Sequence, residues 1–276
     1  MTTNPKVTLV TCKALPNLFP GEEGLLDELA SRGCDPQIKV WNDPDVDWAD
    51  AGMVVVRSVS DYAADRPAFL EWTRQLRRVQ NSKDVLNWNT DKHYLKELAA
   101  MGLPTIPTNW LEPSQKLTKH QIHTRFPAFG EFVVKPAVSS GVRDVGRYTT
   151  VDIRQRQAAM RQVQGLLGEG RSVMLQRYVE EIDLHGEISL VFFNGLVSHA
   201  VEKRSALHPA SVTDPKMHEA VLTADSADSV AWTWGEQIRC VLHNYVRARL
   251  GHDEQFLFNR VDLVPDGKGS FLVMEV

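Results

Sequence analysis

The stretch EISLVFFNGLVSHAVEK, residues 187–203, decides the fold of the second half of the chain. It contains two β-rich runs, Glu187–Phe193 and Leu196–Lys203, joined by Asn194-Gly195. Asn-Gly is typical of a type I′ turn, because that turn needs positive φ at both central residues, and it returns the chain antiparallel. The second half is therefore expected to be α+β and to be built on hairpins.

The first part of the chain has a different pattern, in which strands and helices alternate. Apolar β-branched runs predict strands at Lys6–Thr11, Gln37–Trp41 and Met53–Val56. The segments between and after them predict helices over 22–32 and 67–79. Continuous apolar strands separated by helices favour a parallel sheet with helices on its faces, which is an α/β layer.

Between these parts we expect further elements in a less regular order. Thr90 is predicted to cap a helix over Asp91–Met101. The other predictions are a strand at 132–135, a Ser/Gly-rich loop at 137–146, a helix at 152–167, a strand at 172–176, a mobile polar loop at 204–228, a helix at Ser229–Leu250 and a last hairpin from Phe256–Val264 to Ser270–Val276.

Composition narrows the class of protein. The chain has 276 residues, 43% of them hydrophobic, and a formal net charge of −4, which argues against a dedicated nucleic-acid binder. Three scattered cysteines form no disulfide framework or zinc motif. No apolar run approaches the ~20 residues that span a bilayer.

We expect a soluble, cytoplasmic protein that binds neither nucleic acid nor membrane. A homo-oligomer is one expectation for its assembly. Standard nucleotide-loop, nucleophile-elbow and zinc-protease motifs are missing from the sequence.

The last hairpin carries charged residues where a strand would be apolar. Arg260 and Asp262 are two residues apart and hence share a face, and the return strand brings Glu275 opposite or diagonal to them. Facing carboxylates repel each other, and a bridging divalent cation would remove that cost. An ion-pair cluster centred on Arg260 explains the same spacing, and both interpretations stay open.

Three lysines occupy similar positions, Lys92 at a helix start and Lys135 and Lys203 at the ends of apolar strands. Together with the Ser/Gly-rich loop and the paired carboxylates, they suggest a polyphosphate site with magnesium. The strand over 173–179 ends in Gln-Arg-Tyr-Val and could offer a purine an apolar slot with backbone hydrogen-bonding groups at its edge.

In this order the pieces resemble the ATP-grasp superfamily of carboxylate–amine ligases. The matching stretches are WNTDKHYLKELAAMGLPTIPT (88–108), FVVKPAVSSGVRDVGRY (132–148), VMLQRYVEEIDLHGEISLVFFNGLVSHAVEK (173–203) and RVDLV with FLVMEV (260–276). The N-terminal part is similar to the subgroup that includes the O-ureido-serine cyclo-ligase of D-cycloserine biosynthesis. The resemblance implies the ATP-grasp fold, with an N-terminal parallel α/β domain over 1–88, a central lid subdomain over 89–180 and a C-terminal mixed-sheet subdomain over 181–276.

The resemblance also implies a reaction and a set of roles. ATP would phosphorylate the carboxylate of a small amino-acid-like substrate, and an amine-type nucleophile would attack the acyl-phosphate, giving an amide or a cyclised product. Mg²⁺ would bind Asp262 and Glu275. The residues implied to bind ATP are Lys92, Lys135, Gln176, Arg177, Tyr178, Val179, Asp183, Glu187 and Lys203. Those implied in catalysis are Arg260, Lys203, Ser140 and Arg143, and those implied in substrate binding are Arg57, Ser58, Ser139 and Arg143.

The end of the sequence bears on this expectation. The family usually has a further metal ligand two residues after the position of Glu275, whereas this sequence stops at Val276. We expect the natural chain to continue with that ligand and a terminal helix. A non-catalytic ATP-binding protein with an incomplete metal site is the alternative, and a plain α/β interaction module is a third.

Overall fold

The computed structural model describes residues 4–204, 207, 219–223 and 229–276. The chain forms two compact units, one of Met1–Thr90 with Glu254–Leu257 and the other of Asp91–Asp253 with Phe258–Val276. Each unit is described by itself. The three-part division expected from the sequence stays a prediction. In the part of the chain that the structure describes, no helix is long and apolar enough to cross a membrane.

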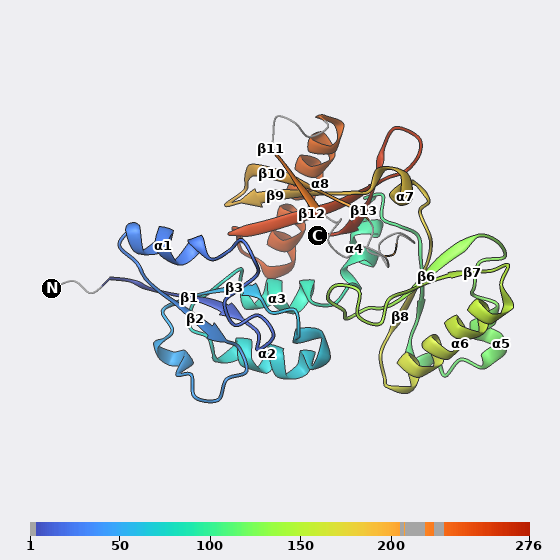
Figure 1. Ribbon diagram of the computed structural model, residues 1–276, viewed down its shortest axis with the longest axis horizontal. Helices are drawn as coiled ribbons and strands as arrows, with labels where there is room; N and C mark the ends of the chain where they lie inside the picture. Colours follow the sequence, from blue (N-terminus) through green and yellow to red (C-terminus); the bar gives the residue numbers. More distant parts are fainter. Residues whose placement is uncertain (1–3, 205–206, 208–218, 224–228) are drawn as a thin grey trace. The chain divides into compact units, whose positions relative to one another are not determined.

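The N-terminal unit is built on a parallel sheet, as the alternating pattern predicted (Figure 1). Its strands, in the spatial order β2-β1-β3-β4, are Asp35–Val40, Lys6–Thr11, Met53–Ser58 and Val79–Gln80. Its α-helices are α1 (Gly24–Ser31), α2 (Arg66–Gln75) and α3 (Lys83–Asn89), with the short 3₁₀ turns η1 (Trp48–Asp50) and η2 (Tyr62–Ala64). The core is aromatic: Trp41 and Trp72 pack on Phe69 with ring centroids 5.5 and 5.3 Å away.

The prediction for Thr90 is wrong. Thr90 ends α3, which the sequence analysis missed, and the next helix, α4, covers only Tyr94–Ala100. The Thr90 hydroxyl donates to the Leu86 carbonyl at 2.8 Å and accepts from Arg66 Nε at 2.9 Å. The side chain is therefore engaged with the preceding helix and not with the following one.

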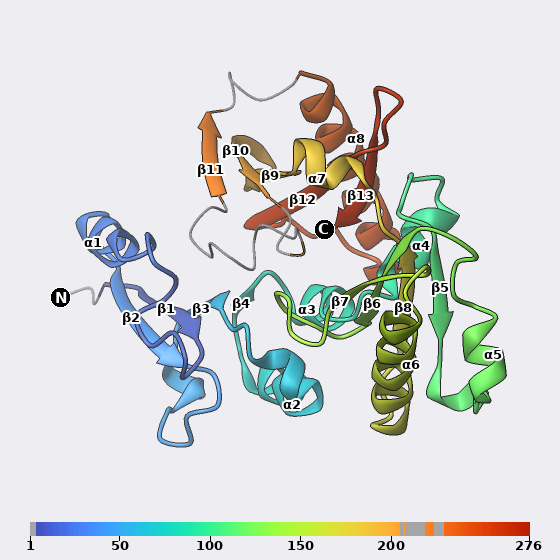
Figure 2. The same ribbon diagram turned by 45° about the vertical axis from the view of Figure 1, so that its right-hand side comes forward.

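The second unit contains two sheets. The first has the order β5-β8-β6-β7, with strands at Thr108–Leu111, Val173–Arg177, Glu131–Pro136 and Gly146–Thr149. Figure 2 shows α6 (Ile153–Gly168) and α5 (Lys119–His123) beside this sheet. A buried cluster that includes Phe132, Val163 and Leu175 joins β6, α6 and β8. The connector before β6 also holds the 3₁₀ turn η3 (Pro113–Gln115).

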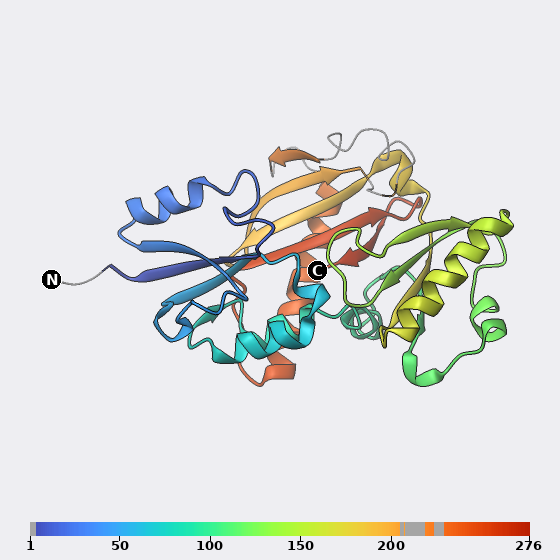
Figure 3. The ribbon, with the colours of Figure 1, turned by 60° about the horizontal axis from the view of Figure 1, so that its bottom comes forward.

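The second sheet has the order β11-β10-β9-β12-β13 and is antiparallel throughout (Figure 3). Its strands are Glu219–Thr223, Leu196–Lys203, Glu187–Phe193, Phe258–Pro265 and Phe271–Glu275. Asn194 and Gly195 have φ of 52° and 78°, so the predicted turn conformation is confirmed. The segment 204–228 was predicted to be a loop, but it contains the strand β11, so that prediction is corrected there. Apart from 204, 207 and β11, the segment lies outside the described residues.

The helix α8 (Ser229–Leu250) begins and ends where the sequence predicted, and it covers one face of the second sheet. A Cβ on Gly235 would lie 2.3 Å from the Leu190 side chain, so glycine is what lets helix and strand approach this closely. Because side chains alternate along a strand, Glu187 and Ser189 point to the opposite face from Leu190. The short helix α7 (Glu181–His185) connects the two sheets along the chain.

Candidate ATP-binding active site

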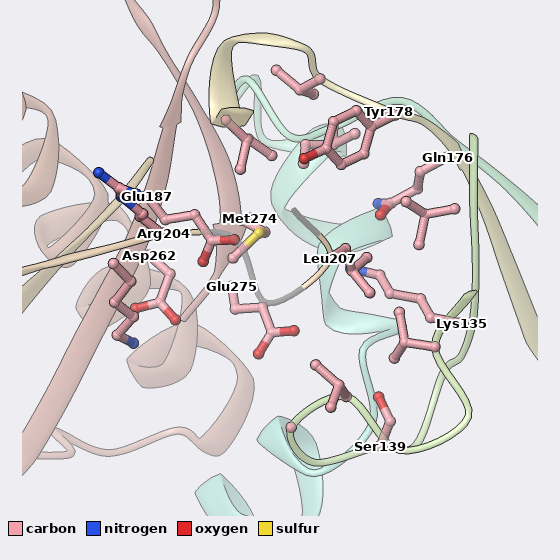
Figure 4. A pocket seen from close by; sticks show the side chains of 18 of the residues that line it. Lys135, Ser139, Gln176, Tyr178, Glu187, Arg204, Leu207, Asp262, Met274 and Glu275 are labelled. Atoms are coloured by element: carbon pink, nitrogen blue, oxygen red, sulfur yellow. The ribbon is translucent and has the colours of Figure 1, made fainter. Parts of the chain in front are cut away.

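A cavity of about 330 Å³ lies within the second unit, and Figure 4 shows its side chains. Both sheets of that unit contribute to its wall. The lining residues are Ile106, Val133, Lys135, Ser139, Gly141, Val142, Val145, Gln176, Arg177, Tyr178, Val179, Ile182, Glu187, Lys203, Arg204, Leu207, Arg260, Asp262, Met274 and Glu275. Apolar side chains from β6, from the residues just after β8 and from α7, and charged ones from β9, β10, β12 and β13, give the cavity two chemically different ends.

The apolar end surrounds Tyr178, just after β8. Val133, Ile182 and Val264 pack with Tyr178 in one buried cluster, and Met274 packs against it. The Tyr178 amide donates to the Glu131 carbonyl at 2.9 Å, which holds the backbone here in an extended course. Apolar walls beside backbone polar groups just after the end of a strand suit a purine ring.

Arg147, on β7, fixes Tyr178 and was missed by the sequence analysis. Its guanidinium lies 3.6 Å from the Tyr178 ring centroid and binds Asp183 through two nitrogens, at 3.0 and 2.7 Å. Burial lowers the pKa of Arg147, but the hydrogen bonds to Asp183 and Glu131 outweigh that effect and the pKa is raised. No motif identifies such a residue, because its partners come from separate elements.

The charged end begins with the last hairpin, in which Asp262 is directly opposite Glu275. This confirms the predicted register of the two carboxylates. Arg260 donates to both Asp262 oxygens at 2.7 Å, and the charge of Asp262 raises the pKa of Arg260. The ion-pair interpretation is therefore geometrically correct, and it does not exclude a cation site, because Glu275 extends the carboxylate pair to the cavity.

A third carboxylate, Glu187, lines the same end of the cavity. Burial and the neighbouring charge of Asp262 raise its pKa to about 7. Lys203 lies opposite Glu187 in the strand register and partly offsets this rise. A Cβ on Gly186, whose φ is +76°, would lie 2.5 Å from the Lys203 carbonyl oxygen. Glycine is thus required where the start of β9 approaches the end of β10.

Lys135 and Lys92 bring positive charge from outside this sheet. Lys135 ends β6, is 8% exposed and lines the cavity, and burial lowers its pKa. Lys92 Nζ donates to the Ser139 carbonyl at 2.9 Å and lies 3.5 Å from Glu275 Oε1. The backbone amide of Lys92 also donates to the Ala137 carbonyl, so Lys92 secures the start of the Ser/Gly-rich loop.

The structure thus brings most of the predicted site residues of the second unit to one cavity. The residues of that set outside the described lining are Lys92, Ser140, Arg143 and Asp183. Arg143 is exposed in the same loop as Ser139, while Asp183 pairs with Arg147. Their functional roles stay predictions.

Arg57 and Ser58, the predicted substrate contacts, end β3 in the N-terminal unit. Arg57 Nε donates to Glu22 Oε1 at 3.1 Å, and the Ser58 hydroxyl donates to Glu22 Oε2 at 2.9 Å. In the sheet, β2 lies on one side of β1 and β3 on the other, so the strand order reverses at β1, and ligands of parallel sheets bind at the carboxyl ends of strands beside such a point. Glu22 was missed, because nothing in its sequence context distinguishes it from other helix-start acids.

The donor set at the charged end fits a magnesium ion bound together with phosphates. Mg²⁺ is commonly held by one or two carboxylates plus substrate phosphate oxygens and water, not by a full protein cage. Asp262 and Glu275 supply such a pair, and no group of three or more His, Cys, Asp or Glu suited to a metal occurs among the described residues. Lys135 and Lys203 provide the positive charge that phosphates require.

Comparison with a solved structure shows the fold. The fold is similar to that of the ATP-grasp ligase PsnB complexed with a phosphomimetic variant of its minimal precursor, Mg and ADP, with a TM-score of 0.56 over 99% of this chain and 90% of that chain at 15% identity. This likeness shows that the chain has the ATP-grasp fold.

Closer relatives identify the family. The family model for the N-terminal domain of D-cycloserine synthetase DcsG matches residues 7–87. The cycloserine biosynthesis protein DcsG of Streptomyces lavendulae is 34% identical over 260 residues, covering 91% of this chain and 83% of that protein. The crystal structure of D-cycloserine synthetase DcsG has a TM-score of 0.80 at 31% identity, covering 98% of this chain and 90% of that chain. The chain belongs to the DcsG family of ATP-grasp ligases.

Proposed function

We propose that this protein activates a small amino-acid-like carboxylate with ATP, forming an acyl-phosphate and ADP, and that an amine-type nucleophile then displaces phosphate to give an amide or a cyclised product. The observation that carries the proposal is the two-ended cavity, apolar at Tyr178 and charged at Asp262. Its relative DcsG, named for cycloserine biosynthesis, supports a cyclised amino-acid product as one form of this reaction.

At the apolar end, the adenine would lie against Tyr178 and Val179, with backbone groups of 176–179 at its edge. Gln176 donates to Thr108 Oγ1 at 2.8 Å, which keeps its amide fixed beside the ring. Arg177 is held at the rim by the Phe129 carbonyl. Glu187 and Asp183 are the proposed ribose-side residues. This arrangement excludes water from the ring and orients the phosphates toward the charged end.

At the charged end, Lys135, Lys203 and Lys92 would neutralise the phosphates, and Asp262 with Glu275 would hold Mg²⁺. The metal, when bound, supplies charge neutralisation for the transferring phosphoryl group. Arg260 would stabilise the negative charge that develops on the substrate carboxylate. No protein nucleophile is needed, because positioning and charge account for most of this type of catalysis.

The remaining proposed roles concern substrate binding and are given for each unit separately. Ser139, Ser140 and Arg143 belong to the loop that we propose closes over the transferring phosphoryl group. Arg57 and Ser58 are proposed to contact the acceptor substrate, since a guanidinium matches a carboxylate. Binding of ATP is thus assigned to the second unit, and acceptor selection in part to the first.

The test is a screen for ADP release over paired amino acids and amines, with Mg²⁺ present and products identified by mass. The expected result is ADP formation that depends on a specific substrate pair and disappears in Lys135→Ala. Tight ATP binding without turnover for any pair would instead favour a non-catalytic nucleotide-binding protein. Unchanged nucleotide affinity in Lys135→Ala would contradict the assignment of the cavity.

A further inference from the structure

Ser189, on β9, is a buried polar residue with an unsatisfied hydroxyl. It is 1% exposed, and its Oγ has no hydrogen-bond partner among the described residues. Buried hydroxyls are nearly always hydrogen-bonded, because the lost contact with water must be replaced. An orphaned hydroxyl in a strand that otherwise buries apolar groups therefore requires an explanation.

The position of Ser189 in the sheet supplies one. It lies directly opposite Asp262 in the register between β9 and β12, on the face that also carries Glu187. Directly opposite residues have Cβ atoms about 4.5–5.5 Å apart, within reach of a hydrogen bond between a serine hydroxyl and an aspartate oxygen. In the structure the carboxylate does not use this donor; its two oxygens instead accept from Arg260, each at 2.7 Å.

Asp262 therefore has two sets of potential partners, and in the structure it pairs with only one of them. Turned along its own strand, it pairs with Arg260 and leaves Ser189 unpaired. Turned across to β9, one oxygen can accept from Ser189, and the other remains toward Glu275, which faces Asp262 on the far side. Such a turn of the carboxylate would break its two-point pairing with the Arg260 guanidinium.

We propose that Ser189 is a positioning residue that holds Asp262 in its cation-binding orientation and thereby frees Arg260 for the substrate. This inference rests on the proposed function, because it concerns the same Mg²⁺ and nucleotide site. Ser189 itself is outside the described lining of the cavity and touches neither ligand. Its hydroxyl acts only through the Asp262 carboxylate.

The experiment uses the whole chain and measures Mg²⁺ dependence apart from activity. ATP binding is followed by calorimetry and by thermal unfolding over a Mg²⁺ titration, and again with the metal chelated. Ser189→Ala removes the hydroxyl and Ser189→Thr keeps it. Thr150→Val is the matched control, because Thr150 also has a buried hydroxyl without a partner among the described residues but lies after β7, outside the lining.

In Ser189→Ala we expect the Mg²⁺ concentration for half-maximal effect to rise about 10-fold or more, as is typical when a residue that orients a metal ligand is lost. ATP affinity without metal should stay unchanged, and the ligand-free Tm should stay equal or rise, because an unsatisfied hydroxyl has been removed. Ser189→Thr and Thr150→Val should keep the wild-type Mg²⁺ dependence.

A Mg²⁺ midpoint in Ser189→Ala within about 2-fold of wild type would overturn the inference, since that difference is below the usual effect of losing such a residue. A lower ligand-free Tm in Ser189→Ala would also overturn it, because the hydroxyl would then have a structural partner. If the wild-type protein binds ATP neither with nor without Mg²⁺, the proposed function fails first and this inference fails with it. The two failures are thus distinguishable.

Discussion

Two clusters in the second unit each combine an arginine with carboxylates. They differ in how completely their charged and polar groups are paired. Arg147 binds carboxylates of β6 and α7, and its ring contact with Tyr178 completes the cluster. Around Arg260, by contrast, Glu187 has a pKa near 7, Lys135 has a lowered pKa, and the Ser189 hydroxyl has no hydrogen-bond partner among the described residues. A cluster whose charges are paired with one another stabilises the fold. A cluster with perturbed pKa values and an unsatisfied polar group is typical of a ligand-binding site.

The largest effect should come from the unsatisfied cluster. Asp262→Asn should lower ADP release by about 100-fold to 1,000-fold, because the lost carboxylate is both the proposed metal ligand and the charge that pairs with Arg260. Steady-state rates at saturating ATP and Mg²⁺ measure this. Asp253→Asn is the control, because Asp253 is an exposed partner of Arg247. Equal rates in the two variants would contradict the assignment of Asp262.

Changes in the Arg147 cluster should lower the stability of the protein before they affect its activity. Arg147→Ala leaves the carboxylates of Glu131 and Asp183 without their shared cation, and we expect the free energy of unfolding to fall by about 2–3 kcal/mol. Urea denaturation of the ligand-free protein measures this. Arg147→Lys should recover part of the loss, since it keeps the charge but not the paired hydrogen bonds. An Arg147→Ala variant that is as stable as wild type but inactive would contradict the assignment of the Arg147 cluster to the stability of the fold.

Protonation of Glu187 gives a pH-dependent test of the conflict in the Arg260 cluster. Its pKa is raised from 4.5 to about 7, so the folded protein holds this proton more tightly than the unfolded chain. The wild type should therefore lose stability as pH rises from about 4.5 through 7, by an amount on the order of 1–3 kcal/mol. Glu187→Gln lacks this loss. In denaturant titrations, the unfolding free energy of Glu187→Gln relative to wild type should rise from pH 5 to pH 8. Parallel pH dependences of the two proteins would contradict the raised pKa of Glu187.

How much of this was predictable depends on whether a feature is local in sequence. The Asn194-Gly195 hairpin and the pairing of Asp262 with Glu275 follow from turn chemistry and strand periodicity, and both are confirmed. The helix start at Thr90 was predicted wrongly, because a threonine hydroxyl can satisfy either neighbouring helix and only tertiary contacts decide which.

Features assembled from distant segments could not be predicted. Arg147 meets Asp183 and Tyr178 only because β7, β8 and α7 converge, and Ser189 is an ordinary strand residue until its neighbour across the sheet is known. Family resemblance supplied the roles proposed for the cavity residues. It gave no information on the satisfaction of individual hydrogen bonds, which depends on register and side-chain orientation.

A third cluster, around His93, offers the smallest and most specific test of the comparison. His93 follows Lys92 and hydrogen-bonds Asp91 at 2.6 Å and Glu112 at 3.0 Å, while Lys96 also approaches Glu112 and the Trp110 ring stacks on the imidazole. The hydrogen bond to Asp91 and then that to Glu112 raise the His93 pKa above 6.5 despite its burial.

Because the His93 pKa is raised, the stability it contributes is fully present below pH 6.5 and is lost as pH rises through the folded-state value. His93→Gln should therefore cost about 1 kcal/mol at pH 6, a size typical of a partly exposed ion pair, and less at pH 9. Denaturation at the two pH values measures this. ATP affinity at pH 8 should match wild type, because His93 is paired with Asp91 and Glu112 and does not line the cavity. A cost that grows toward pH 9 would contradict the direction of the pKa shift, and a large loss of ATP affinity would place His93 with the conflicted cluster through Lys92.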